Sequence, residues 1–149
     1  MALISGGNSN DILAGTRNAD IIHGKGRRDY IAAGGGNDFI DGGLGNDILN
    51  GGSGNDRFFF GRLHDADIIT DFGPNDILDL GDGIDHYFVT QVPNGIRIAT
   101  VDWDYTADLV QGSIVLNGVT RAEWESWGGS FGNPNGYSVS SYSSGMLIV

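Results

Sequence analysis

The chain has 149 residues, which is the size of a single domain. Its 19 acidic residues outnumber the 8 basic ones, so the formal net charge is −11. This balance argues against nucleic acid or an anionic membrane as a partner, because both require basic patches. The chain contains no cysteine, which excludes disulfides and Cys-ligated zinc. Its apolar runs are too short for membrane insertion, and its first residues are too few for an N-terminal signal peptide.

From Gly6 the sequence divides into six consecutive nine-residue units without insertion. The sixth position of every unit is aspartate: Asp11, Asp20, Asp29, Asp38, Asp47 and Asp56. The eighth position is always large and apolar: Leu13, Ile22, Ile31, Ile40, Leu49 and Phe58. Two invariant columns at a strict spacing indicate a repeat architecture.

Each unit predicts a tight turn followed by a short strand. The glycines at positions 1, 2 and 4 allow positive φ and close backbone approach, so the first six residues form the turn. The last three residues form strands at 12–14, 21–23, 30–32, 39–41, 48–50 and 57–59. If each unit turns the chain through half a revolution, alternate units stack into two facing parallel sheets. We therefore expect an all-β fold, a parallel β-roll with the apolar column lining both inner faces.

The aspartate columns would then stack along the two edges of the roll. Adjacent strands lie about 4.8 Å apart, so the carboxylates would repel one another unless a cation lies between them. Calcium fits best, because it accepts about six to eight oxygen ligands, including backbone carbonyls, in flexible geometry. Zinc prefers His or Cys, and magnesium retains more of its water. The alternative, that these residues only form turns, is weak for six units in register.

The unit resembles the RTX, or hemolysin-type, calcium-binding repeat, whose consensus is G-G-x-G-x-D-x-U-x. The resemblance implies that aspartates and carbonyls of the glycine-rich turns hold each ion between successive turns on one edge. Carried over, it predicts four internal sites, between Asp11 and Asp29, Asp29 and Asp47, Asp20 and Asp38, and Asp38 and Asp56. The best-matching turns add the carbonyl donors Gly34, Gly36, Gly43, Gly45, Gly52 and Gly54.

The second unit has Thr16 and Asn18 where glycine is usual, and the third has the basic side chains Lys25, Arg27 and Arg28 in its turn. Positive φ is costly for such side chains, and their charge opposes a nearby cation. We therefore expect the Asp38/Asp56 site to bind calcium most tightly and the Asp11/Asp29 site to bind it most weakly. Alternatively, the arginines neutralise stacked aspartates where no ion is bound.

Beyond the repeats, Asp65 continues the nine-residue spacing and is expected to close a fifth site against Asp47. This gives about four to five calcium ions in total. The segment that begins at Asp67 and contains Asp71 is similar to the one that follows the repeats in serralysin-like secreted RTX proteins. Both residues are therefore further candidate ligands, whereas Asp76 and Asp79 could equally be turn residues.

The sequence predicts three regions: a calcium-binding roll (6–65), a capping β region (66–127) and an uncharged tail (128–149). Within the cap, antiparallel strands are expected over 84–119, and Thr120 and Glu123 have capping-box spacing for a short helix. The tail is either frayed or, by the resemblance, an uncleaved type I secretion signal.

The residues show no catalytic constellation, so we expect this chain itself not to be an enzyme. The favoured hypothesis is an extracellular or cell-surface calcium-binding module that folds on external calcium and supports type I secretion. One alternative is a polysaccharide-binding accessory module resembling the R-modules of alginate epimerases. Another is the C-terminal fragment of a secreted protease, lipase or adhesin.

Overall fold

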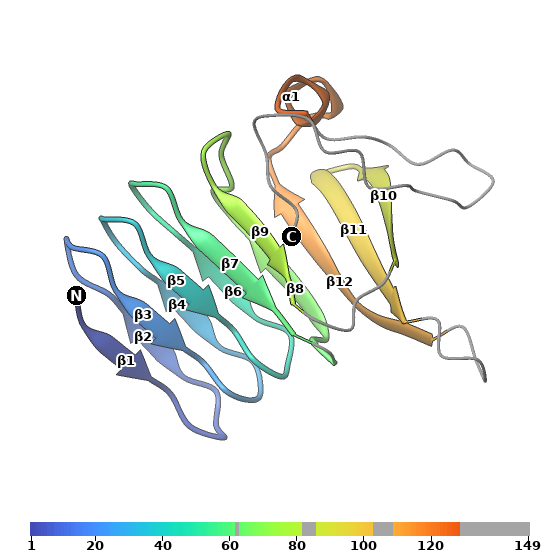
Figure 1. Cartoon of the computed structure of the whole chain (residues 1–149). Helices are drawn as coiled ribbons and strands as arrows, with labels where there is room; N and C mark the ends of the chain where they lie inside the picture. The colour runs from blue at the N-terminus through green and yellow to red at the C-terminus, as the bar shows by residue number, and fades with distance from the viewer. Residues whose placement is uncertain (62, 82–85, 103–108, 129–149) are drawn as a thin grey trace.

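The repeats form a coil in which the chain alternates between two parallel sheets (Figure 1). The computed structural model describes residues 1–61, 63–81, 86–102 and 109–128. Strands of alternate units pair in parallel register, so that Ile40 lies between Ile22 and Phe58. The expected all-β parallel roll is confirmed.

One sheet, named sheet A, contains only strands of the coil. In spatial order these are β1 (Leu3–Ser5), β3 (Ile21–His23), β5 (Phe39–Asp41), β7 (Arg57–Phe60) and β9 (Ile77–Leu80). The other, sheet B, contains β2 (Ile12–Ala14), β4 (Tyr30–Ala32), β6 (Ile48–Asn50) and β8 (Ala66–Ile69). Sheet B then continues into β12 (Leu109–Asn117), β11 (Gly95–Asp102) and β10 (His86–Val92).

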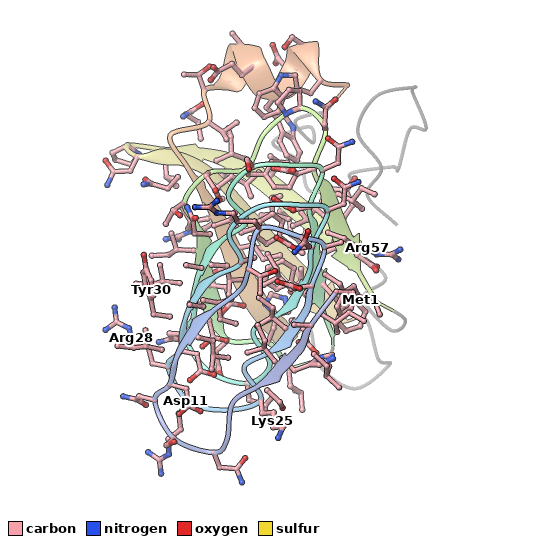
Figure 2. The ribbon with its side chains drawn as sticks, turned by 90° about the vertical axis from the view of Figure 1, so that its left-hand side faces the viewer. Met1, Asp11, Lys25, Arg28, Tyr30 and Arg57 are labelled. Carbon is pink, nitrogen blue, oxygen red and sulfur yellow. The ribbon has the colours of Figure 1, made fainter. Side chains whose placement is uncertain are left out.

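The core is one layer of apolar side chains from each sheet. Because side chains alternate along a strand, the middle residue of each three-residue strand points inward. Ile22, Ile31, Ile40, Leu49 and Phe58 are all fully buried in this way. The residue before each of them points outward, and Figure 2 shows Tyr30 and Arg57 on opposite faces of the roll. Burial of one apolar column thus holds every turn at a fixed place on an edge.

The roll is longer than the sequence predicts at both ends. At the start, β1 precedes the first unit, and its Ile4 pairs with Ile22. At the far end, β8 pairs in parallel with β6 and β9 with β7, so the coil runs to Leu80 rather than ending at residue 65. The expected boundary at 65/66 therefore falls inside the roll.

The C-terminal end of the roll is covered, and the predicted antiparallel strands are present. β10 pairs with β11 and β11 with β12, while β12 joins sheet B by pairing in parallel with β8. The short helix α1 (Arg121–Ser126) follows, with Thr120 and Glu123 forming the expected capping box and Trp124 fully buried. No helix in the described part of the chain is long and apolar enough to span a membrane. The predicted secretion signal lies outside the described residues, apart from Gly128.

Candidate calcium-binding edges

The aspartates form a hydrogen-bonded ladder along each edge of the roll. The first edge carries Asp11, Asp29, Asp47 and Asp67, and the second carries Asp20, Asp38, Asp56 and Asp76. In both ladders Oδ1 accepts a hydrogen bond from the backbone N–H of the preceding aspartate. For example, the N–H of Asp29 donates to Asp47 at 2.8 Å, and that of Asp38 donates to Asp56 at 2.9 Å. The first oxygen of each carboxylate therefore has a structural role.

The second oxygen distinguishes the ends of the ladders from their centres. At the N-terminal end, Oδ2 of Asp11 accepts from the N–H of Gly7 at 2.6 Å, and that of Asp20 accepts from Thr16 at 2.7 Å. At the far end of the second edge, Oδ2 of Asp76 accepts from Gly73. These carboxylates satisfy both oxygens with donors from the protein.

The central carboxylates lack this second partner. Oδ2 of Asp29, Asp38 and Asp47 is buried and has no hydrogen-bond partner among the described residues. Leaving a buried charged oxygen unpaired is costly, so these three atoms require an explanation. Burial raises the pKa of all three carboxyls, that of Asp47 to about 7, and burial likewise raises the pKa of Asp56 to about 6. The central carboxylates are thus poorly stabilised in their charged form by the protein alone.

The turn geometry changes at the same point in the chain. Positions 2 and 4 have positive φ in the third to sixth units, at Lys25, Arg27, Gly34, Gly36, Gly43, Gly45, Gly52 and Gly54. No residue of the first two turns has positive φ. In the later turns, a carbonyl oxygen points at the residue eighteen positions on: a Cβ added at Gly52 or Gly54 would collide with the oxygen of Gly34 or Gly36. The carbonyls of Gly34 and Gly36, two of the expected donors, therefore point at the next stacked turn.

Glycine at position 1 serves the expected close approach and not positive φ, because a side chain at Gly24 would also collide with the carbonyl oxygen of Gly42. Neither Gly24 nor Gly42 adopts positive φ. A side chain at either residue would collide with Oδ2 of the aspartate five residues later, Asp29 or Asp47. The absent side chain makes room for the unpaired oxygen.

These features fit calcium by donor chemistry. The unpaired carboxylate oxygens and the turn carbonyls are all hard oxygen donors, which calcium prefers. A carbonyl has two lone pairs, so one that accepts a backbone N–H can still coordinate an ion. Within the described residues, His, Asp and Glu side chains form no metal-binding cluster of three or more. An ion between two turns of an edge would take its further ligands from backbone carbonyls, as a flexible calcium site allows.

Beyond the repeats, the expected register is wrong by two residues. The N–H of Asp47 donates to Asp67, twenty residues later, so Asp67 and not Asp65 occupies the next place in the ladder. Asp65 is exposed, and its carbonyl accepts a hydrogen bond from Ser113. On the second edge Asp76 takes the place after Asp56. Asp71 lies at the sixth turn, where it accepts from the N–H groups of Gly51 at 3.0 Å and Gly52 at 2.7 Å.

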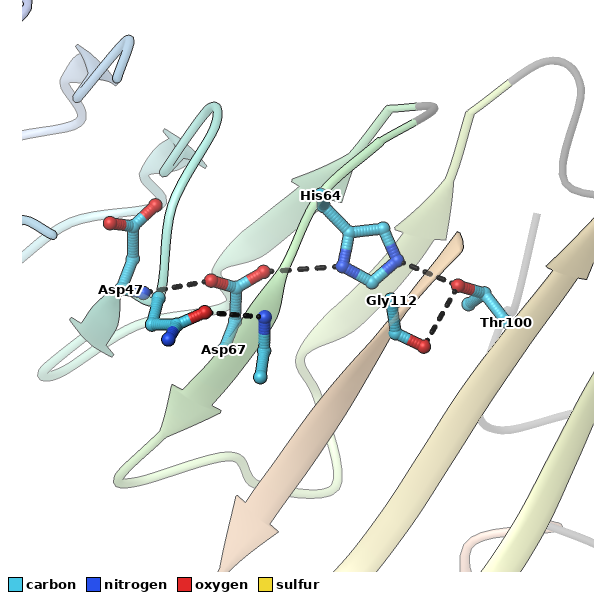
Figure 3. A network of polar contacts seen from close by, with 7 residues as sticks. Asp47, His64, Asp67, Thr100 and Gly112 are labelled. Atoms are coloured by element: carbon cyan, nitrogen blue, oxygen red, sulfur yellow. Dashed lines mark hydrogen bonds and ion pairs between the residues drawn. The ribbon is translucent and has the colours of Figure 1, made fainter. Parts of the chain in front are cut away.

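A buried histidine ends the first ladder (Figure 3). Oδ2 of Asp67 faces Nδ1 of His64 at 3.2 Å, and Nε2 of His64 contacts the hydroxyl of Thr100 at 2.9 Å. Thr100 in turn donates to the carbonyl of Gly112. Because Thr100 and Gly112 belong to the cap, this chain of contacts links the last ladder aspartate of the first edge to β11 and β12. Sequence reasoning missed His64, since no local spacing connects it to residue 100.

The basic third turn does not neutralise the ladder. Lys25, Arg27 and Arg28 are exposed, and none of them forms an ion pair with a described residue. Lys25 has φ 84° and Arg27 has φ 73°, so both are in the left-handed region that disfavours side chains. The alternative in which these arginines pair with stacked aspartates is therefore not seen in the described part of the structure.

A roll whose edges place unpaired carboxylates beside carbonyl-lined turns defines a calcium-binding solenoid. Residues 5–26 and 23–58 match the family model of the RTX calcium-binding nonapeptide repeat, with four copies. The N-terminal region of this chain is thus similar to RTX repeats, which in general bind calcium and are typical of extracellular proteins. No curated protein matches the chain.

Among solved structures, the chain is similar to the AlgE6R3 subunit from the Azotobacter vinelandii mannuronan C5-epimerase, determined in solution. The two are 28% identical, the alignment covers 78% of each chain, and the TM-score is 0.57. That subunit comes from an enzyme, whereas the repeats matched here are non-catalytic calcium-binding units.

Proposed function

We propose that this chain is the calcium-dependent module of a secreted protein and that its roll folds when calcium binds between the turns. The observation that carries the proposal is the set of buried, unpaired Oδ2 atoms at Asp29, Asp38 and Asp47. Calcium supplies the missing positive charge there and links each carboxylate to carbonyls of the stacked turns.

The ion sites are assigned to the four carboxylates whose pKa is raised within the repeats. These are Asp29 and Asp47 on the first edge and Asp38 and Asp56 on the second, with carbonyls of residues 34, 36, 43, 45, 52 and 54 as further ligands. Asp11 and Asp20 contribute less, because the protein already occupies both of their oxygens. By the same criterion Asp67 and Asp71 contribute less, and the exposed Asp65 is left out.

Ion binding would couple directly to folding. Four ions carry a charge of +8, which against −11 leaves −3, so most of the self-repulsion is removed. Because stacked turns exist only in the folded chain, the binding free energy stabilises the fold. A chain that is loosely structured at low calcium can pass through a secretion channel and then fold outside the cell. The uncharged tail at 128–149 is the candidate signal for that type I route.

A calcium titration followed by circular dichroism and native mass spectrometry tests this function. We expect about four bound ions, and a midpoint at about 10⁻⁴–10⁻³ M, the range of extracellular calcium modules. A folded protein that binds no calcium would contradict the proposal. A midpoint far below this range would contradict the extracellular setting but not the calcium sites.

Polysaccharide binding is a second candidate, favoured by two observations. The chain is similar to a subunit of a mannuronan C5-epimerase, and Lys25, Arg27 and Arg28 are exposed without ion pairs to described residues. Titrating uronate oligomers into the calcium-loaded protein tests this, with Arg27→Ser and Arg28→Ser as the variant. Binding to the wild-type chain that is lost in the variant supports polysaccharide binding. A titration of the wild-type chain that gives no heat of binding rejects it.

A further inference from the structure

The two aspartate ladders end differently at the C-terminal side of the roll. On the second edge, Oδ2 of Asp76 accepts the N–H of Gly73 from its own loop, and sheet A ends at β9 in the described structure. On the first edge, Oδ2 of Asp67 faces the ring of His64, and sheet B continues from β8 into the cap. The second ladder therefore ends locally, whereas the first ladder is joined to β11 and β12.

The fifth turn holds the start of β8 by hydrogen bonds. The N–H of Asp47 donates to Oδ1 of Asp67 at 2.9 Å (Figure 3). Next to it, the side-chain oxygen of Asn46 accepts the N–H of Ala66 at 3.0 Å. Asn46 and Asp47 belong to the turn whose aspartate keeps a buried, unpaired Oδ2. Calcium at that oxygen would order this turn, and with it the contacts that position Asp67.

His64 carries the contact from Asp67 into the cap. Its side chain is 2% exposed, and its two ring nitrogens face Oδ2 of Asp67 at 3.2 Å and the hydroxyl of Thr100 at 2.9 Å (Figure 3). A Cβ added at Gly112 would collide with the carbonyl oxygen of His64, so the backbone of β12 also lies against this residue. If Asp67 or Thr100 moved away, a buried ring nitrogen would lose its partner, which is costly. The two ring contacts should therefore form and break together.

We propose that His64 is the positioning residue through which calcium on the first edge holds the cap against the roll. This inference rests on the proposed function, because it requires an ion between Asp29 and Asp47. Calcium on the second edge lacks this route, so its loss should leave the cap in place. The apolar core is continuous from both sheets into the cap and would couple the two edges to it alike. Pairing of β8 with β12 could favour the first edge without His64, so the test must also separate these two routes.

Hydrogen exchange of the cap, measured together with ion counts from native mass spectrometry, tests the dependence on one edge. Asp47→Asn removes a charge from the first edge and Asp38→Asn from the second, and each asparagine keeps the Oδ1 acceptor of its ladder. Where each variant lacks an ion that the wild type binds, the amides of β11 and β12 should exchange about fivefold faster or more in Asp47→Asn only. Equal exchange in the two variants would overturn this inference alone. A wild-type chain that binds no ions would overturn the proposed function as well.

Substitutions at the cap side of the contact test the route through His64. Thr100→Val removes the hydroxyl that the ring contacts, whereas Thr100→Ser keeps it. Thr100→Val should abolish the response of cap exchange to Asp47→Asn, and Thr100→Ser should retain it. His64→Asn, which can still reach Asp67 but is too short for Thr100, should act like Thr100→Val.

The coupling must also be visible from the calcium side. Because coupling between two sites is reciprocal, Thr100→Val should weaken calcium binding at Asp47 by about the same factor as it lowers cap protection. Isothermal titration calorimetry measures this loss, with Thr100→Ser as the control. Effects of Thr100→Val and Asp47→Asn on cap exchange that simply add would show that the hydroxyl only stabilises the cap, and the inference would fail.

Discussion

The first two turns of the roll and the four that follow share an aspartate at position 6 and an apolar residue at position 8. They differ in whether the protein supplies a hydrogen-bond donor to the second carboxylate oxygen. In the first two, the carboxylate accepts a backbone N–H from its own turn, as Asp11 does from Gly7. In the next four, positions 2 and 4 adopt positive φ, and three of the four aspartates leave a buried oxygen without a described partner. Under the proposed function, an aspartate column alone does not mark an ion site. The turn must also leave the second oxygen unpaired.

Of the changes that distinguish the two kinds of turn, removal of calcium should have the largest effect on the fold. We expect the chain in a chelator to lose most of its β-sheet signal in circular dichroism, because the central carboxylates then have neither ion nor donor. Calcium should restore the signal and magnesium should not, since magnesium gives up its water reluctantly. A chain that is equally folded in chelator would show that all six turns are satisfied without ions.

Replacing single aspartates by asparagine distinguishes the two kinds of turn by their effect on calcium affinity. Asp47→Asn should weaken calcium binding by at least about tenfold, or about 1.4 kcal/mol. The matched control on the same edge is Asp11→Asn, which should change calcium affinity by much less. Isothermal titration calorimetry measures both. Equal losses in the two variants would contradict the distinction between satisfied and unpaired carboxylates.

Asp47→Asn should weaken calcium binding but stabilise the calcium-free fold. Burial raises the pKa of Asp47 to about 7, so its ionised form destabilises the folded state in the absence of an ion. Asparagine at this position removes that charge. We expect Asp47→Asn to increase the residual structure in chelator at neutral pH, measured by circular dichroism. A further loss of structure in chelator would mean that the carboxylate is stabilised by the protein itself.

The pH dependence follows from the raised pKa values of Asp47 and Asp56, about 7 and about 6. Between the unfolded pKa near 4 and these values, the folded calcium-free chain binds more protons than the unfolded chain. Its stability should therefore fall as pH rises from about 4 to 7. Calcium must displace those protons, so calcium affinity should rise over about pH 5.5 to 7.5. Affinity that is flat with pH would contradict the assignment, and Asp47→Asn should reduce the slope.

Replacing the positive-φ side chains of the third turn by glycine should have the smallest effect on stability. Lys25 and Arg27 are in the left-handed region, which costs a side chain about 1–2 kcal/mol, while glycine loses about 0.5–1 kcal/mol more entropy on folding. Lys25→Gly and Arg27→Gly should therefore each stabilise the calcium-loaded roll by roughly 0.5–1 kcal/mol. Thermal unfolding measures this against Arg28→Ser, which removes a charge from a residue without positive φ. A gain no larger than that of Arg28→Ser would assign the effect to charge alone.

The strict spacing of the repeats explains why the roll was predictable. Because position 8 is apolar in every unit, only one register buries Ile22, Ile31 and Ile40 together, and that register aligns the aspartates. The antiparallel cap and the Thr120 capping box also followed from local pattern. β1 was missed because Leu3–Ser5 is a strand without a preceding glycine-rich turn.

The register beyond the sixth unit could not be read from the sequence. Two additional residues between Asp47 and Asp67 change the offset from eighteen to twenty, and Asp65 happens to keep the nine-residue spacing. Only the pairing of β8 with β6 decides between these two aspartates. The burial of His64 likewise depends on contacts with the cap, far away in sequence. Nor did the aspartate column reveal which aspartates keep an unpaired oxygen, because Asp11 and Asp47 occupy the same column, although position 4 is Ser9 before one and Gly45 before the other.

The most direct measurement is a crystal structure of the chain grown in calcium, with anomalous scattering used to locate the ions. The predicted result is a calcium ion at about 2.3–2.6 Å from Oδ2 of Asp29, Asp38 and Asp47, with turn carbonyls completing each coordination shell. Anomalous peaks confined to Asp11 and Asp20, or none along either edge, would contradict the account.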